Sequence, residues 1–158
     1  MILQPISLSK ELKTLEITSE AFNDRTYIPI KYTCDGENVN PPLTIHNIPL
    51  ETKSLVLIVD DPDALSGVCV HWIVWNIPPS GKIKEKTVPG IEGINDFKKH
   101  NYSGPCPPSG THRYFFKVYA LNDLIELEQP VNSADLDKLM NPHIIGFGEL
   151  IGLYKRAM

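Results

Sequence analysis

The stretch from Tyr102 to Leu121 constrains the fold most, because a stiff loop runs directly into an apolar strand. Its first part reads Gly104-Pro-Cys-Pro-Pro-Ser-Gly110, a composition that suits neither the hydrogen bonding of a sheet nor helical dihedrals. Residues 112–121 are mostly aromatic, aliphatic or β-branched, which favours a strand. Since alternate side chains of a strand share a face, we expect His112 and Tyr114 to project to one side above an apolar floor. Such an arrangement beside a rigid loop is typical of a small-ligand site.

Two further segments predict strands at the centre of a sheet. Residues 54–60 and 70–77 are apolar on both faces, and so both faces of these strands should be covered. A period of two along 70–77 places His71, Ile73, Trp75 and Ile77 on one side and Trp72 and Val74 on the other. Shorter strands are expected within four segments: 13–22, 27–32, 43–48 and 149–155.

One clear helix is expected near the C-terminus. Asn132 or Ser133 can cap it, and Pro142 should end it. Its apolar stripe would consist of Leu136, Leu139 and Met140. Many short strands separated by Gly and Pro, with one helix, predict a mainly β, sandwich-like fold with helices at its edge.

Length and charge restrict the class of protein. A chain of 158 residues suits a single domain, here residues 1–158, whose core needs no disulfide or metal to fold. The net charge of -4 and the absence of long charge runs argue against nucleic-acid binding. Three cysteines, Cys34, Cys69 and Cys106, are odd in number and lack metal-ligand spacing, which predicts reduced thiols.

The N-terminal segment predicts no targeting signal. It has no basic region followed by an apolar one, and no stretch approaches the roughly 18 apolar residues of a membrane span. We therefore expect a cytoplasmic protein without an integral membrane segment.

Polar side chains stand at the ends of the three long predicted strands. Asp61 ends one strand, whereas His71 and His112 begin the other two. In an antiparallel sheet, the end of one strand lies beside the start of its neighbour. The three side chains can therefore gather at one edge of a sheet if these strands are neighbours.

Five segments resemble signature blocks of the phosphatidylethanolamine-binding protein family, also called the Raf kinase inhibitor protein family. The three long blocks are 61–64 (Asp-Pro-Asp-Ala), 70–78 (Val-His-Trp-Ile-Val-Trp-Asn-Ile-Pro) and 102–114. Segments 33–43 and 95–97 are similar to the bacterial and archaeal branch of that family. The resemblance implies an antiparallel sandwich of a large and a smaller sheet, with a small pocket for phosphate-like anions.

The resemblance also implies which residues form that pocket. The ligand-binding set would be Asp61, His71, His112 and Tyr114, with Gly104, Cys106 and Pro107 as the loop wall. The flanking set would be Asp63, Trp75 and Tyr102. Imidazole, phenol and backbone N–H groups are donors that a phosphoryl oxygen can use. Asp61 can orient a histidine and raise its pKa, which would keep that ring a cationic donor.

The hypothesis is a non-enzymatic binding protein for a phosphorylated small molecule, a phospholipid headgroup or a phosphorylated partner, acting without a cofactor. The alternative is a regulator that inhibits a kinase or protease, in which the pocket is incidental. Two histidines and a carboxylate could also form a metal site, and Cys106 or Ser109 near His112 could be a hydrolase nucleophile. The anion hypothesis is favoured because a metal site would leave Tyr114 and the glycine loop without a role. A homodimer is compatible with the resemblance.

Overall fold

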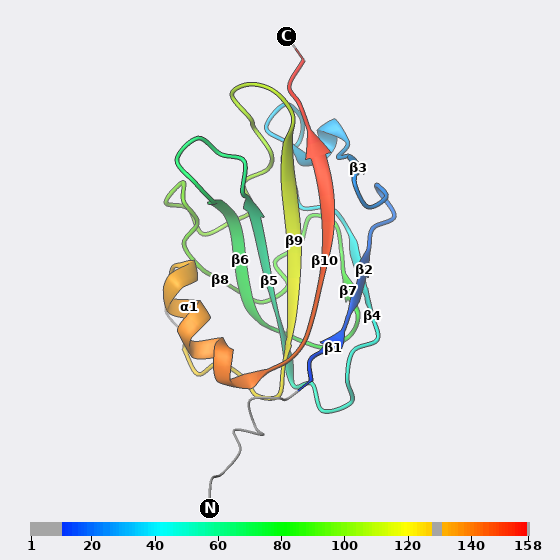
Figure 1. Ribbon diagram of the computed structural model, residues 1–158, viewed down its shortest axis with the longest axis vertical. Coiled ribbons are helices and arrows are strands. Elements are labelled where there is room, and N and C mark those ends of the chain that lie inside the picture. Colours follow the sequence, from blue (N-terminus) through cyan, green and yellow to red (C-terminus); the bar gives the residue numbers. More distant parts are fainter. Residues whose placement is uncertain (1–10, 128–130, 158) are drawn as a thin grey trace, which may run out of the picture.

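The computed structural model describes residues 11–127 and 131–157, and it confirms a mainly β fold built from two sheets and one short α-helix (Figure 1). The strands are β1 Lys13–Thr14, β2 Glu16–Thr18, β3 Thr26–Tyr27, β4 Leu43–His46, β5 Ser54–Asp61, β6 Cys69–Ile77, β7 Lys82–Ile83, β8 Ile91–Glu92, β9 His112–Leu121 and β10 Ile144–Tyr154. The helices are α1 Ser133–Met140 and two short 3-10 helices, η2 Ile30–Tyr32 and η3 Asn141–His143.

The large sheet has seven strands, and β5 lies at its centre. Its order is β1-β10-β9-β5-β6-β8, with β3 also paired to β10. The long strands β6, β5, β9 and β10 run antiparallel to one another, whereas the two-residue strands β1 and β3 run parallel to β10. The smaller sheet has the order β2-β4-β7 and is antiparallel.

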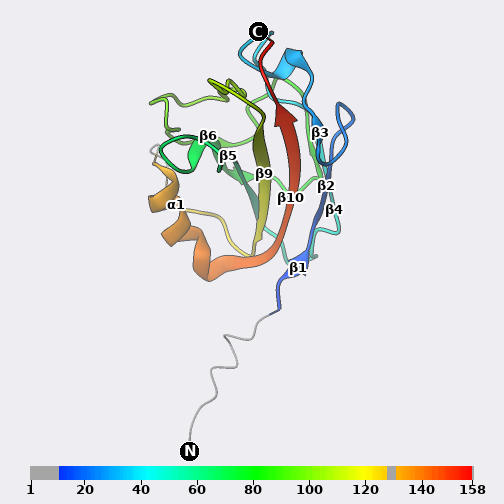
Figure 2. The same cartoon turned by 45° about the horizontal axis from the view of Figure 1, so that its top comes forward.

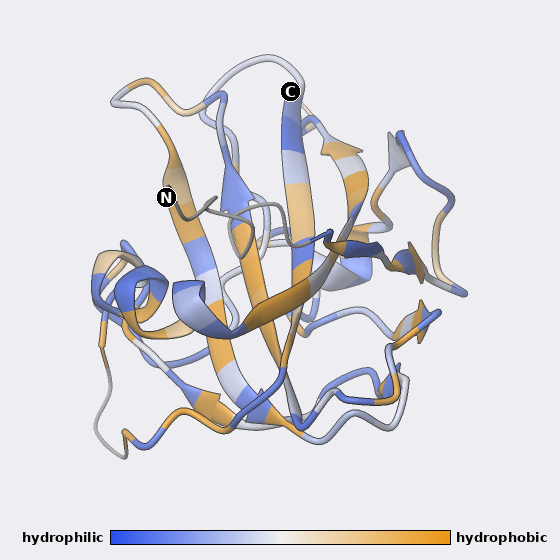
Figure 3. Cartoon of the chain, turned by 60° about the horizontal axis from the view of Figure 1, so that its bottom comes forward, coloured by the Kyte–Doolittle hydropathy of each residue, from blue (hydrophilic) through white to orange (hydrophobic). Residues whose placement is uncertain are grey.

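Both faces of the large sheet are covered, which explains why all eight residues of β5 are buried. Leu57 and Phe116 belong to the core that the large sheet shares with Ile17 and Ile45 of the smaller sheet. The opposite face forms a second core, whose members include Val56, Ile73, Trp75, Leu136 and Met140. Figure 3 shows the corresponding alternation of apolar and polar segments along the long strands.

Helix α1 begins as the sequence predicts, but its apolar stripe is narrower. The Asn132 side chain accepts a hydrogen bond from the Asp135 N–H and caps the helix. Leu136 and Met140 are buried, whereas Leu139 is 43% exposed and does not belong to the core. No helix in the described part of the chain is long and apolar enough to cross a membrane.

Two irregularities in β6 change which face its residues occupy. Val59 pairs with Trp72 and Asp60 with Val70, so His71 is an extra residue at a bulge. The His71 ring contacts Tyr114, which belongs to the same core as Trp72. A second register shift, at Asn76 with φ 53°, returns Ile77 to that core. The expected grouping of His71 with Ile73, Trp75 and Ile77 is therefore wrong.

Candidate functional site

The polar strand ends gather at one end of the molecule. The end of β5 lies between the starts of β6 and β9, and the loops that join these strands lie near the C-terminus (Figure 2). Asp61, His71, His112 and Tyr114 are all buried, with relative exposures of 3%, 3%, 8% and 0%. We call these four residues the strand-end cluster.

Asp61 and His112 form the central pair of the cluster. The Nδ1 atom of His112 lies 2.7 Å from Asp61 Oδ2, and both side chains are almost fully buried. The other carboxylate oxygen, Asp61 Oδ1, accepts the Asp63 backbone N–H at 2.7 Å. Asp61 therefore fixes the orientation of the His112 ring, as the sequence predicts for one of the histidines.

His71 is held by the loop rather than by Asp61. Its Nδ1 atom lies 2.6 Å from the Ser103 carbonyl oxygen, and its ring makes edge contacts with Phe97 and Tyr114. Burial lowers the pKa of His71 below its ordinary value, although the Ser103 carbonyl and the Asp61 charge oppose that shift. The Asp61 charge raises the pKa of His71 as expected, but desolvation of the ring is the larger effect, so the expectation that the ring stays a cationic donor is wrong for His71.

Tyr114 lies between the two imidazole rings. Its ring centroid is 5.4 Å from that of His71 and 6.4 Å from that of His112. Burial, followed by the Asp61 charge, raises the pKa of its hydroxyl, while the nearby Cys106 backbone N–H lowers it. The Asp61 carboxylate and the Cys106 N–H lie close to this buried hydroxyl, but no group among the described residues meets it in hydrogen-bond geometry. A buried polar group without a partner is uncommon and marks a candidate ligand-binding position.

Gly104 forms the back of the loop. A side chain at Gly104 would bring its Cβ to 2.4 Å from the Tyr32 carbonyl oxygen and 2.5 Å from Asn38 Oδ1, so only glycine fits there. The Gly104 N–H donates to Asn38 Oδ1 at 2.8 Å and is not free for a ligand. Pro107 is buried in the same loop and lines a cavity of about 230 Å³ together with Lys155 and Arg156.

The prediction of three reduced thiols is wrong, because Cys34 and Cys106 form a disulfide. Their Cα atoms lie 5.5 Å apart, although they are separated by 72 positions in the sequence. The Cys34 N–H donates to the Pro105 carbonyl oxygen, which aligns the two loops that carry these cysteines. The Cys106 sulfur is therefore committed to a bond and is no candidate nucleophile. Cys69 keeps a free thiol, and burial raises its pKa to about 11.

The residues predicted to flank the site have different positions. Asp63 pairs with Arg113 at the rim, and the pKa of its carboxyl is lowered to about 2, chiefly by the hydrogen bonds from that guanidinium. Tyr102 supports the loop, since its hydroxyl donates to the Tyr32 carbonyl oxygen at 2.8 Å. Trp75 lies on the opposite face of the sheet, in the second core, and its indole N–H donates to the Leu127 carbonyl oxygen. Trp75 is therefore not part of the site.

Sequence reasoning missed the residues that shape the loop from behind. Asn95 is buried, and its side-chain amide donates to the carbonyl oxygens of His71 and Asn101. Its Oδ1 atom accepts the backbone N–H groups of Phe97 and Lys99. Asn38 has φ 63° and accepts the Gly104 N–H. Asparagine is enriched at turns and at positive φ, so this signal was present in the sequence.

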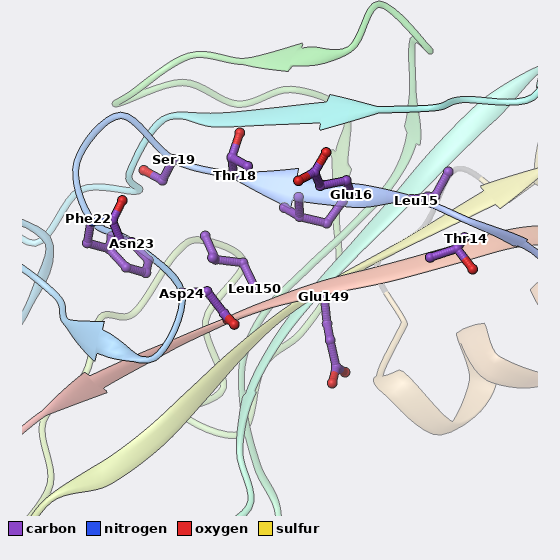
Figure 4. Close-up of a pocket in the computed structure, with 11 residues that line it drawn as sticks. Thr14, Leu15, Glu16, Thr18, Ser19, Phe22, Asn23, Asp24, Glu149 and Leu150 are labelled. Atoms are coloured by element: carbon purple, nitrogen blue, oxygen red, sulfur yellow. The ribbon is translucent and has the colours of Figure 1, made fainter.

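A second cavity, of about 330 Å³, lies between β2 and β10, away from the strand-end cluster (Figure 4). Its wall includes the acidic residues Glu16, Asp24 and Glu149. Figure 4 shows that the side chains of Glu16 and Glu149 point in opposite directions, so their carboxylates do not converge. Within residues 11–127 and 131–157, no three His, Cys, Asp or Glu side chains are arranged to hold a metal ion.

Comparison with known proteins agrees with the fold. Residues 18–155 match the family model described as phosphatidylethanolamine-binding protein. The chain belongs to the phosphatidylethanolamine-binding protein family. It is 47% identical to a UPF0098 protein of the archaeon Methanothermobacter thermautotrophicus, over 90% of this chain and all of that protein.

Two crystal structures from the family share the fold. A phosphatidylethanolamine-binding protein homolog from Chlamydia trachomatis has a TM-score of 0.88 and 38% identity, covering 92% of this chain and 99% of that one. YbcL of Escherichia coli, described as a member of the mammalian family, has a TM-score of 0.83 and 28% identity, covering 90% and 99%. Membership of this family supports a binding protein.

Proposed function

We propose that the strand-end cluster binds a small oxyanion of the phosphate type, either free or as the headgroup of a larger molecule, without catalysing a reaction. The observation that carries this proposal is the Tyr114 hydroxyl, which is buried between two histidine rings and has no partner among the described residues. A hydroxyl in that position can donate to an oxyanion that enters the cluster.

The surroundings of that hydroxyl support the same class of ligand. His112 is oriented by Asp61 through Nδ1, so its Nε2 is available to a ligand. The Cys106 backbone N–H lies near the Tyr114 hydroxyl and is a further donor. The cluster also lacks a nucleophile, because Cys106 is in a disulfide and Asp61 is engaged by two donors. These features favour binding over catalysis.

Calorimetric titration with sodium phosphate and with phosphoethanolamine tests the proposal. We expect saturable binding between the millimolar and micromolar range, because a few charge-assisted hydrogen bonds are offset by the cost of immobilising the ligand. His71→Ala and His112→Ala should each abolish it. His46→Ala is a matched control, since His46 is exposed on β4, outside the cluster.

The proposal fails if the folded wild-type protein binds neither anion at tens of millimolar. It also fails if the two cluster variants bind as well as His46→Ala. Either result would favour the alternative hypothesis of a protein–protein regulator and would direct the next experiment to a search for its partner.

A further inference from the structure

Both histidines of the cluster contact a protein oxygen through the same ring nitrogen, Nδ1. His71 Nδ1 faces the Ser103 carbonyl oxygen at 2.6 Å, and a carbonyl oxygen can only accept a hydrogen bond. His112 Nδ1 faces Asp61 Oδ2 at 2.7 Å, and the other oxygen of that carboxylate already accepts the Asp63 N–H. Each Nδ1 atom must therefore carry a proton.

This arrangement fixes the tautomer of each neutral ring. A neutral imidazole has one N–H, so when Nδ1 holds the proton, Nε2 presents a lone pair. The hydrogen bonds found for the two rings in the described part of the protein are those of Nδ1, although the Gly104 backbone also lies close to the His71 ring. With neutral rings, the cluster therefore offers two acceptor nitrogens beside two donors, the Tyr114 hydroxyl and the Cys106 N–H.

A fully deprotonated oxyanion such as sulfate does not match that set, because it carries only acceptors. Its oxygens would face two lone pairs at short range. The mismatch disappears if the ligand brings an O–H group or if an imidazole takes up a proton from solvent. Hydrogen phosphate holds an O–H at neutral pH, and phosphate monoesters gain one near pH 6.

The charges around the cluster give the same result. The charged or titratable side chains near its rings are Asp60 and Asp61 on β5, Cys69 on β6, Asp63 and Arg113 at the rim, and Tyr102 in the loop. Arg113 pairs with Asp63, and Lys117 pairs with Asp60 on the opposite face. Among the described residues, Asp61 forms a direct ion pair only with His112, if that ring is protonated, and Arg113 feels the Asp61 charge without pairing with it. A second anion beside Asp61 is therefore favoured by a proton.

Resting on the proposed oxyanion function, we propose that the cluster binds its oxyanion together with a proton. The site therefore selects phosphates and phosphate monoesters, which carry or readily gain an O–H, over sulfate and sulfonates. The proton resides on Nε2 of a histidine or on a ligand oxygen. Burial of His71, which lowers its pKa and so favours the neutral ring, is consistent with proton uptake when an anion enters.

Calorimetry in two buffers of different ionisation enthalpy measures this proton directly. Sulfate and phosphate are titrated at constant ionic strength in Tris and in HEPES, from pH 7 to 8.5. We expect uptake of about one proton per sulfate, so that sulfate affinity falls about tenfold per pH unit, and a smaller uptake for phosphate. Phosphate should bind at least tenfold more tightly than sulfate at pH 8.

Two outcomes overturn different claims. If sulfate binds as tightly as phosphate at pH 8 without proton uptake, the inference is wrong although the oxyanion function stands. If neither anion binds, the proposed function fails, and the inference fails with it. The wild-type protein alone gives both answers, so neither depends on a variant that folds.

A variant and a spectrum locate the proton. His112→Gln replaces the ring by an amide that donates without titrating, so it should reduce both the proton uptake and the preference for phosphate, whereas His46→Gln should retain both. Imidazole ¹⁵N spectra of the ligand-free protein at pH 8 should show the Nδ1–H tautomer for His71 and His112. An Nε2–H tautomer on both rings would contradict the inference.

Discussion

At the scale of single residues, two buried tyrosines differ in one hydrogen bond. The Tyr102 hydroxyl donates to the Tyr32 carbonyl oxygen, whereas the Tyr114 hydroxyl has no partner in the described chain. Removing a hydroxyl whose partner stays buried leaves that partner unsatisfied, but removing an unpartnered hydroxyl does not. The two positions therefore separate a structural role from a ligand-binding role.

Tyr114→Phe should leave the free energy of unfolding unchanged or raise it by up to about 1 kcal/mol, since a buried hydroxyl without a partner is costly. It should weaken phosphate binding by roughly 10- to 100-fold, the value of one hydrogen bond to a charged ligand. Urea unfolding and calorimetric titration measure the two quantities.

Tyr102→Phe is the matched control and should show the opposite pattern. It should lower the free energy of unfolding by about 1–3 kcal/mol, because the Tyr32 carbonyl oxygen loses its donor. Phosphate affinity should change less than in Tyr114→Phe. Similar losses of stability in both variants would mean that the Tyr114 hydroxyl has a protein partner after all.

His71 should make stability depend on pH. Burial lowers its pKa in the folded protein below the ordinary value of 6.5, so between the two values the unfolded chain binds more protons. The contribution of the neutral His71 ring to the free energy of unfolding is fully present above pH 6.5 and is lost as the pH falls toward the lower pKa of the folded protein. At pH 5.5 the loss cannot exceed about 1.4 kcal/mol, the limit for one group at one pH unit below its unfolded value.

Urea unfolding of the wild type and of His71→Asn at pH 7.5, 6.5 and 5.5 checks this sign. The asparagine side chain can still donate to the Ser103 carbonyl oxygen but cannot titrate. The wild type should therefore lose stability relative to the variant as the pH falls. A wild-type advantage that grows toward low pH would show that the His71 ring is stabilised in its charged form.

At the scale of elements, the sequence predicts strands best where burial is complete. Residues 54–61 and 112–121 form long strands, because an apolar or alternating pattern is repeated over many positions. The two-residue strands β7 and β8 have no comparable pattern, since each is defined by a partner distant in sequence. The bulge that brings His71 toward Tyr114 is also a property of the pairing with β5 and not of β6 alone.

The disulfide between Cys34 and Cys106 was not predicted from the sequence. Its two cysteines are brought together by contacts between loops, such as the Cys34 N–H to the Pro105 carbonyl oxygen, which no local pattern encodes. Alkylation under denaturing, non-reducing conditions should modify one thiol per chain, that of Cys69, and three after reduction. Modification of three thiols without reductant would contradict the disulfide.

Reducing the Cys34–Cys106 bond should lower the free energy of unfolding by about 2–4 kcal/mol, because it releases a long loop in the unfolded chain. The fold should survive, since the two loops keep the bonds from Cys34 to Pro105 and from Gly104 to Asn38. Urea unfolding with and without a dithiol reductant measures the change. A Cys34→Ser/Cys106→Ser double variant should reproduce it and lose its response to reductant, whereas Cys69→Ala should keep that response.

At the scale of the whole molecule, the strand-end cluster exists only because the sheet orders its strands as β9-β5-β6. Asp61 and His112 are separated by 51 positions, yet they lie 2.7 Å apart. Sequence reasoning anticipated this meeting from strand polarity, since one strand ends where its neighbours begin. It could not decide which histidine pairs with Asp61, because the bulge and the loop carbonyl of Ser103 determine that choice.

Because three central strands and one loop contribute to the cluster, a bound oxyanion should stabilise the whole fold against global unfolding. A ligand that binds only the folded state at 100 times its dissociation constant adds about 2.7 kcal/mol. For a chain of this size that raises Tm by roughly 5–10 °C.

Thermal unfolding in increasing phosphate, with sodium chloride at matched ionic strength as the salt control, should show the rise in the wild type and in His46→Ala. The rise should be absent from a folded His71→Ala/His112→Ala variant. An equal rise in that double variant would mean that phosphate stabilises the protein through general salt effects and not through the cluster.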